Sequence, residues 1–164
     1  MVPPPQTLGY GFDDGPNCSH NAFYDYLTSQ NQKATMFFIG SNVYIWPLQA
    51  KRAFEDGHEL CIPGLIKQMQ AIKLVAGVTP TCFRPPLGDT DDRIRYISDS
   101  LGLRTVLWKH DTKDTIPGPS GTVDPADVDK NYEDFLRVAE SGAFANPGAI
   151  LLAREPPHIK CLKL

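Results

Sequence analysis

The chain has 164 residues and a net charge of −3, and its 41% hydrophobic, 10% aromatic and 21% charged residues are typical of one globular domain. No more than two basic residues are adjacent, which argues against a nucleic-acid or anionic-membrane partner. No apolar run approaches the ~20 residues of a membrane-spanning helix, and the first six residues lack the charged leader and apolar core of a signal peptide.

Predicted strands alternate with predicted helices of about ten residues, and this alternation indicates a parallel α/β architecture. The first helix is expected to place Phe23, Tyr26 and Leu27 on one face, and the continuous apolar run 34–39 is typical of a strand buried on both sides. In chain order the predicted elements are strand 8–12, helix 21–29, strand 34–39, helix 47–55, strand 57–61, helix 65–76, strand 81–84, helix 91–101, strand 104–108, helix 131–141 and strand 149–152, with a loop at 115–127.

Polar clusters follow three of these strands: Asp13-Asp14, Arg84 and the segment 111–114. Chemistry in parallel α/β folds gathers where strands end, so we expect the clusters to share one rim. One of two adjacent carboxylates can hold a metal ion while the other acts as a general base; a solvated turn is the alternative. Arg84 can hold a carboxylate by two hydrogen bonds, with a structural ion pair as the alternative, and we expect it within roughly 4 Å of Asp13.

The four cysteines show no C-x-x-C spacing, so the sequence does not predict a thiolate zinc site. Their even number is compatible with two disulfides, and the three possible pairings stay open. Asn17-Cys18-Ser19 is a glycosylation acceptor if the chain is secreted, or a tripeptide that occurs by chance.

Five ordered motifs between residues 8 and 155 resemble those of the NodB-homology polysaccharide deacetylases. The matching segments are 12–16 and 33–40, 57–60, 84–89 with 91–93, 107–114, and 148–155. Residues 17–21 and 77–81 resemble the fungal chitin deacetylase branch. The resemblance implies one domain over 1–164, a truncated distorted parallel (β/α) barrel that is incomplete by an apparent deletion after Cys61 and an early C-terminal end.

The resemblance also implies a chemistry, the removal of acetyl groups from chitin or a related N-acetylglucosamine polysaccharide with a divalent zinc or cobalt ion. It places the protein outside the cell or at the cell wall, and we expect a monomer. By position, Asp13 matches the general base, Asp14 the carboxylate metal ligand, Arg84 the arginine that orients the base, and Asp114 the aspartate that tunes the catalytic acid. The continuation of the third motif is assigned to substrate binding: Pro85, Pro86, Gly88 and Asp89.

The chain departs from the family pattern where histidines are needed. The metal-binding pair, two histidines four positions apart, is missing after Cys61, and no histidine occurs between His58 and His110. Arg154 stands where the family has its catalytic histidine, and arginine stays protonated in proteins. Thr115 replaces the tryptophan of the acetyl pocket.

The remaining histidines do not replace the missing pair in the predicted site. We expect His58 to be structural and His20 to be a surface or capping residue, while His110 lies beside the predicted rim and would supply one ligand at most. Metal binding should therefore be weak. The sequence leaves two hypotheses: a catalytically impaired deacetylase-like domain, or a non-catalytic glycan-binding pseudoenzyme of the same fold.

Overall fold

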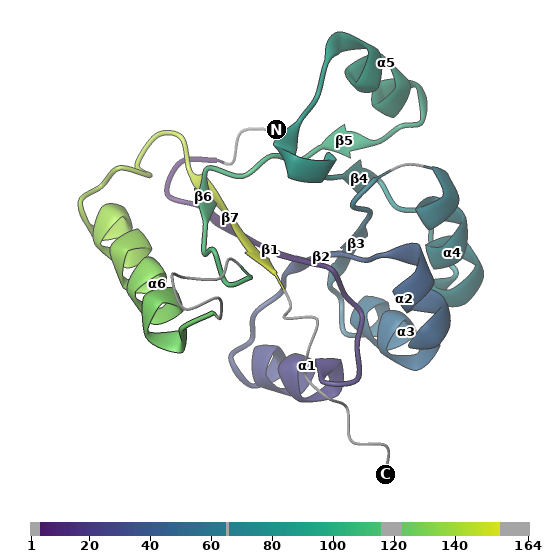
Figure 1. Cartoon of the computed structure of the whole chain (residues 1–164), viewed down its shortest axis with the longest axis horizontal. Coiled ribbons are helices and arrows are strands. Elements are labelled where there is room, and N and C mark those ends of the chain that lie inside the picture. The colour runs from purple at the N-terminus through teal and green to yellow at the C-terminus, as the bar shows by residue number, and fades with distance from the viewer. Residues whose placement is uncertain (1–3, 65, 116–122, 155–164) are drawn as a thin grey trace.

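The computed structural model describes residues 4–64, 66–115 and 123–154, and these form the parallel α/β architecture that the sequence predicts (Figure 1). The strands are β1 Leu8–Asp13, β2 Thr35–Phe37, β3 Glu59–Cys61, β4 Cys82–Phe83, β5 Arg104–Thr105, β6 His110–Asp111 and β7 Ala149–Arg154. The helices are α1 His20–Ser29, α2 Gly40–Ile45, α3 Pro47–Glu55, α4 Ile66–Ala76, α5 Asp92–Ser100 and α6 Pro125–Glu140, with a 3₁₀ turn η1 at Pro86–Gly88.

The strands are arranged as an incomplete barrel made of two parallel sheets. A five-stranded parallel sheet has the order β3-β2-β1-β7-β6, and β4 and β5 form a separate parallel pair. The segment 104–112 joins the two, because the Val106 N–H donates to Phe83 O at 2.9 Å and the Thr112 N–H donates to Leu152 O at 3.0 Å. On the other side, the Ile62 N–H donates to Cys82 O at 3.2 Å, so backbone hydrogen bonds link the end of β3 to β4, while only the covalent chain connects β5 to β6.

Helices cover the outside of the ring, and the largest apolar core lies between them and the strands β2 and β3 (Figure 1). A smaller cluster of Phe37, Cys61, Cys82 and Val106 fills part of the barrel. In α1 the buried residues are His20, Tyr24 and Leu27, whereas Tyr26 is 62% exposed. Phe23, Tyr26 and Leu27 nevertheless lie on one face of α1, as predicted, because all three line the same groove on the outside of the barrel.

Two helices differ from the sequence-based prediction. The helix α2 was not predicted, because Gly40 reads as a strand terminator; the glycine instead lets α2 pack closely on α4, since a Cβ there would lie 3.2 Å from Gln68 Cα. The helix α6 begins at Pro125 rather than at residue 131. Asp124 caps it by accepting a hydrogen bond from the Ala126 N–H at 2.9 Å, and proline is favourable in the first turn.

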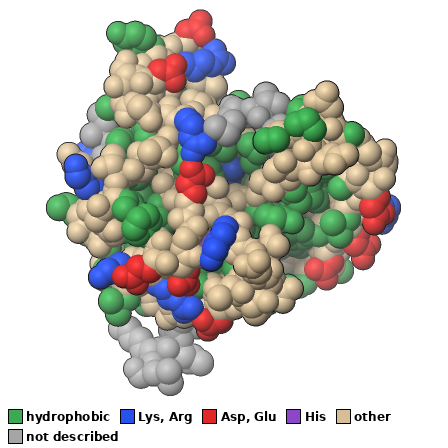
Figure 2. Space-filling model, turned by 180° about the vertical axis from the view of Figure 1, so that it is seen from behind, with side chains coloured by type: hydrophobic (Ala, Val, Ile, Leu, Met, Phe, Trp, Pro, Cys, Tyr) green, Lys and Arg blue, Asp and Glu red, His purple; other side chains and the backbone are tan. Residues whose placement is uncertain are grey.

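Cys61 and Cys82 form a disulfide that ties β3 to β4, and Cys18 is disulfide-bonded as well. Within the described ranges, no helix is long and apolar enough to cross a membrane. Figure 2 shows the face opposite that of Figure 1, where acidic and basic side chains are interspersed among hydrophobic ones. This face carries no broad surface of one sign, as the modest net charge predicts.

Candidate functional site

A cleft of about 320 Å³ that contains charged side chains opens where β1, β4 and β7 end. The register explains the convergence, because Asp13 pairs with Phe37 of β2 and with Arg154 of β7 at the same level of the sheet. The prediction of a shared rim is confirmed for Asp13, Asp14 and Arg84, which all line the cleft. Its lining residues are Asp13, Asp14, Ile39, Pro63, Gln68, Arg84, Pro85, Pro86, Leu87, Trp108, Leu152 and Arg154.

Asp13 and Arg84 form a buried ion pair at the floor of the cleft. Arg84 Nη1 donates to Asp13 Oδ1 at 2.5 Å, within the predicted reach, and Arg84 is only 2% exposed. The guanidinium lies over the ring of Phe37 at 3.9 Å and 5.6 Å from that of Trp108. Burial raises the pKa of Asp13 to about 6, although Arg84 acts to lower it, so this carboxyl can exchange a proton near neutral pH.

Asp14 is held by the backbone at the turn after β1. Its φ of 74° lies in the left-handed region, and its carbonyl accepts a hydrogen bond from Asn42 Nδ2 at 2.9 Å. Burial raises the pKa of its carboxyl, while the charge of Arg154 acts in the opposite direction. A strained backbone that aims a carboxylate into a cleft is common at functional sites.

Arg154, at the end of β7, binds two carboxylates of the rim. Its Nη1 and Nη2 donate to Asp111 Oδ1 and Oδ2 at 3.0 and 3.1 Å, and its backbone N–H donates to Asp114 Oδ2 at 2.7 Å. Asp114 is therefore connected to the rim through its hydrogen bond with the backbone of Arg154. Burial raises the pKa of the Asp114 carboxyl. The arginine therefore neutralises part of the negative charge that four aspartates bring to this edge of the barrel.

The residues assigned to substrate binding divide into two groups. Pro85 and Pro86 line the cleft, and Gly88 sits against Trp108, where a Cβ would lie 3.0 Å from Cη2 of the ring. Gly88 has a φ of 72°, which also favours glycine. Asp89 is exposed and is not among the residues that line the cleft.

The three histidines within the described residues, His20, His58 and His110, lie away from the cleft lining. His58 is 3% exposed and its Nδ1 accepts from the Ala34 N–H at 3.2 Å, which confirms a structural place in the core. His20 is 1% exposed and packs with Tyr24 at 5.1 Å between ring centroids, so of the expected surface or capping places the surface one is wrong. Its Nδ1 accepts a hydrogen bond from the Asn17 N–H at 2.7 Å, in the turn that leads into α1. His110 packs against two phenylalanine rings, Phe135 and Phe144, with each ring centroid 5.1 Å from that of the imidazole.

A catalytic metal does not fit the residues that the structure describes. Asp14 is part of no group of three histidine, cysteine, aspartate or glutamate ligands in these ranges. The group that comes closest is Glu59 with Cys61 and Cys82, and its two sulfurs are bonded to each other. A carboxylate alone is a poor zinc site, because zinc favours four ligands rich in nitrogen and sulfur.

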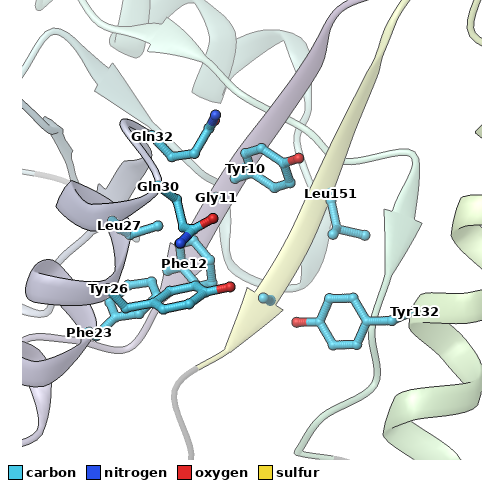
Figure 3. A pocket seen from close by; sticks show the side chains of 11 residues that line it. Tyr10, Gly11, Phe12, Phe23, Tyr26, Leu27, Gln30, Gln32, Tyr132 and Leu151 are labelled. Carbon is cyan, nitrogen blue, oxygen red and sulfur yellow. The ribbon is translucent and has the colours of Figure 1, made fainter.

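A second groove, of about 500 Å³, lies on the outside of the barrel (Figure 3). Phe23, Tyr26 and Leu27 come from α1 on one side and Tyr132 from α6 on the other, with β1 and β7 between them. Its lining is aromatic and aliphatic with two glutamines, and it contains no acidic or basic side chain. The cleft at the rim is therefore the place for acid-base chemistry.

Three residues of the site were not assigned from the sequence. Trp108 lines the cleft, and Asp111 accepts hydrogen bonds from both terminal nitrogens of the Arg154 guanidinium. Arg154 itself was expected only as a departure from the family's motif. Trp108 and Asp111 lie in the segment that resembles the fourth motif, so their sequence positions carried a signal. The Arg154–Asp111 pair has no local signature, because 43 residues separate its partners.

Comparisons with known proteins identify relatives of this chain. Residues 2–65 match the family model described as polysaccharide deacetylase. Chitin deacetylase 2 of Cryptococcus neoformans var. grubii is 46% identical over 172 residues, covering 94% of this chain and 38% of the relative. Chitin deacetylase of Amylomyces rouxii is 44% identical over 170 residues, covering 93% of this chain and 40% of that protein.

Solved structures support the fold. The chitin deacetylase of Colletotrichum lindemuthianum is similar with a TM-score of 0.77 at 22% identity, over 93% of this chain and 75% of that chain. The chain spans about two fifths of the length of the curated relatives. In addition, the 172-residue alignment is longer than this chain although it leaves some of the chain unmatched, so the relative has residues there that this chain lacks.

Proposed function

Because the chain is a homologue of the fungal chitin deacetylases and so a member of the polysaccharide deacetylase family, we propose that it is a deacetylase-like domain whose cleft faces a chitin-type polysaccharide and whose catalysis is impaired. The single observation that carries the proposal is the pairing of Arg154 with Asp111 in a cleft that keeps Asp13 and Arg84. The cleft retains the charge pair for a general base and holds a permanent cation where proton transfer is needed.

The retained parts define the roles that we assign. Asp13 is the general base, because its pKa of about 6 suits proton transfer near neutral pH, and Arg84 orients it through their hydrogen bond. Asp14 is the remaining carboxylate for a metal and Asp114 the aspartate that tunes the acid. Pro85, Pro86 and Gly88 shape the wall beside the substrate, while for Asp89 this role rests on its sequence position alone.

The missing parts explain the impairment. The family depends on a divalent metal, and we infer that a deletion after Cys61 removed its two histidine ligands. The extra residues in the aligned span of the Cryptococcus relative support this deletion. Arg154 stays protonated and cannot deliver a proton to a departing amine near neutral pH. The domain proposed here spans residues 1–164 as an incomplete member of its family.

The compartment and partner follow as parts of the same proposal. The Cys61–Cys82 disulfide is typical of proteins that fold in an oxidising compartment, which supports a secreted or cell-wall protein. The chitin deacetylase relatives support an N-acetylglucosamine polymer as the partner. Trp108 in the cleft suits a sugar ring, because indole rings offer a broad apolar face with one polar atom.

Acetate release from chitin oligomers tests the impairment. We expect no turnover above background with added zinc or cobalt, since general acid catalysis alone contributes about 10²–10⁴-fold. Arg154→His should not restore activity, because the metal ligands are still missing, and calorimetry with zinc should detect no tight site. Turnover at roughly 1 s⁻¹ or faster, or submicromolar zinc affinity, would show that a histidine we regard as structural is recruited.

Glycan binding separates the non-catalytic alternative from a domain without a ligand. The cleft is still open although Arg154 lines it, and this favours a pseudoenzyme that still binds sugar. We expect chitin oligomers to quench or shift the fluorescence of Trp108, with Trp46 outside the cleft lining as the matched control. A Trp108→Phe variant should lose the signal and a Trp46→Phe variant should keep it. An unchanged spectrum at saturating oligomer would contradict glycan binding at this cleft.

A further inference from the structure

The groove on the outside of the barrel, between α1 and α6, has the size and the lining of a ligand site (Figure 3). Its volume of about 500 Å³ falls within the range of roughly 300–1,000 Å³ that is typical of ligand pockets. Tyr10 and Tyr26, which line it, are 39% and 62% exposed, so a ligand can reach both rings. Aromatic side chains that gather at the surface of one hollow mark an interaction site.

The polar groups of the groove are uncharged and accessible. Tyr10, Tyr26, Gln30 and Gln32 are exposed, and the half-buried Tyr132 turns its hydroxyl group toward the strands from the side of α6 (Figure 3). Tyrosine hydroxyls and glutamine amides can each donate and accept hydrogen bonds. A fitting ligand therefore combines apolar faces with hydroxyl or amide groups.

The lining distinguishes between classes of ligand. Among the described residues that line the groove there is no acidic or basic side chain, so neither a phosphate nor an ammonium group would find a counter-charge. The apolar face of a helix would bury the tyrosine hydroxyls and the glutamine amides without partners. A sugar ring has apolar C–H faces and polar groups at its edge, and tyrosine offers the matching apolar ring with a polar tip.

The groove begins directly behind the cleft. Phe12 and Ala153 line the groove, while the next residues of the same two strands, Asp13 and Arg154, line the cleft. Successive residues of a strand face opposite sides of the sheet, so the two hollows meet across the ends of β1 and β7. A polymer that passes over this edge can contact both.

We propose that the outer groove is a second glycan-binding site, which holds an acetylated stretch of an N-acetylglucosamine polymer. The faces of the sugar rings lie against Tyr10 and Tyr26, and their hydroxyl and acetamido groups bond with Gln30, Gln32 and Tyr132. The groove prefers acetylated units, because a deacetylated unit would bring an ammonium group into a site without a carboxylate. The choice of polymer rests on the proposed function, whereas the preference for a neutral sugar follows from the groove itself.

An NMR titration with a chitin hexamer tests the site, because the side-chain amide signals of Gln30 and Gln32 report the groove directly. We expect both signals to shift and to saturate with a Kd of about 1 mM or tighter. The fully deacetylated hexamer should bind at least about fivefold more weakly in high salt, which screens non-specific attraction to the net negative chain. Unchanged amide signals, or equal affinities for the two oligomers, would overturn the proposal.

The same titration separates this site from the cleft, since the fluorescence of Trp108 reports the cleft. Tyr26→Ala removes an exposed ring and should weaken the glutamine response about fivefold or more while the Trp108 response is kept. Tyr96→Ala on α5 is the matched control, because Tyr96 is 75% exposed and outside the groove lining, and both responses should be unchanged. A Trp108 response without a glutamine response contradicts the groove alone, and the reverse contradicts glycan binding at the cleft alone.

Two further measurements test other occupants of the groove. Tyr26→Ala should change the Tm by no more than about 2 °C, as expected for an exposed side chain. A larger loss would mean that another part of the chain covers this ring. Sedimentation of the unmodified chain should show a monomer, and a dimer that dissociates in Tyr26→Ala would place a second copy in the groove. Either of these results would overturn the proposal.

Discussion

Two arginine–aspartate pairs face the same cleft, and they differ in what surrounds them. Arg84 and Asp13 have side chains that are 2% and 13% exposed, and aromatic rings lie against the guanidinium. Arg154 and Asp111 are 23% and 24% exposed, at the open edge of the cleft. In the proposed function, the first pair is machinery retained from the family, whereas the second contains the arginine that we propose stands in the place of a catalytic histidine.

The buried pair of Arg84 and Asp13 should contribute more to the stability of the fold than the pair of Arg154 and Asp111. Removing one partner of a buried pair leaves a charge without solvent or counter-ion, whereas water can solvate a half-exposed partner. Burial also keeps the pKa of Asp13 high even with Arg84 adjacent, because desolvation outweighs the attraction. The two pairs should therefore respond very differently to mutation, pH and salt.

Arg84→Met should have the largest effect, lowering the free energy of unfolding by about 3–5 kcal/mol, because it leaves Asp13 buried without its partner. Urea unfolding at pH 7 measures this. The double variant Asp13→Leu with Arg84→Met is the control and should be less destabilised than the single variant, since no unpaired charge remains. A loss below about 1 kcal/mol in the single variant would contradict a buried pair.

Removing the disulfide tests the strand that carries Arg84. Cys61 and Cys82 are separated by 21 residues, and closing a loop of this length contributes about 3 kcal/mol in the unfolded-chain model. We expect Cys61→Ala with Cys82→Ala to lose about that amount in the same urea assay. Reduction of the unmodified chain should cost at least as much, because it also breaks the disulfide of Cys18. No change in the unfolding free energy would mean that backbone hydrogen bonds and packing hold β3 and β4 together without the disulfide.

The fold was largely predictable because its signals are local. Apolar runs such as 34–39 and turn glycines such as Gly102 gave the strands and their spacing, and the alternation gave the parallel sheet. The helix α2 escaped because its six residues are too short for a periodic pattern. The residues after β5 were equally difficult to predict, because the backbone of the segment 104–112 hydrogen-bonds first to β4 and then to β7.

The candidate site was predictable only in part, for the same physical reason. Asp13 and Arg84 follow apolar strands, so their meeting at one rim could be expected from topology. Cleft contacts made across the ring depend on barrel closure, and these include the pairing of Arg154 with Asp111 and the place of Trp108. The burial of His20 was not predicted, because a polar residue at the start of a helix usually faces solvent. Here the His20 ring packs against the ring of Phe38.

The pH dependence of stability should report Asp13. Its pKa is about 6 in the folded state and 3.8 in the reference state, so the folded protein binds this proton more tightly. The contribution is present below about pH 4 and is lost as pH rises through about 6, at roughly 1.4 kcal/mol per pKa unit. This predicts up to about 2–3 kcal/mol from Asp13, and burial raises the pKa of Asp14 and Asp114 in the same direction.

Asp13→Asn isolates this contribution, because asparagine can still accept a hydrogen bond from Arg84 but does not titrate. The difference in unfolding free energy between this variant and the unmodified chain should change between pH 4 and pH 7. The unmodified chain should lose more stability over that range. Parallel profiles for the two proteins would show that Asp13 titrates at its ordinary pKa.

Arg154→Gln should have the smallest effect, because its partner Asp111 is partly solvated and half-exposed ion pairs contribute about 0–1 kcal/mol. The backbone hydrogen bond from residue 154 to Asp114 is unaffected by the substitution, so β7 keeps that anchor. Added salt should reduce the remaining difference in unfolding free energy between the variant and the unmodified chain, because the screening length for solvent-exposed charges is about 10 Å at 0.1 M and shorter at higher salt. Arg137→Gln on α6 is the matched control, because Arg137 and Asp134 form a pair at 3.1 Å that is 65% and 50% exposed, and its loss should be close to zero. A loss above about 3 kcal/mol for Arg154→Gln that persists in 1 M salt would place its pair with the buried class, and the contrast between the two arginines would then fail.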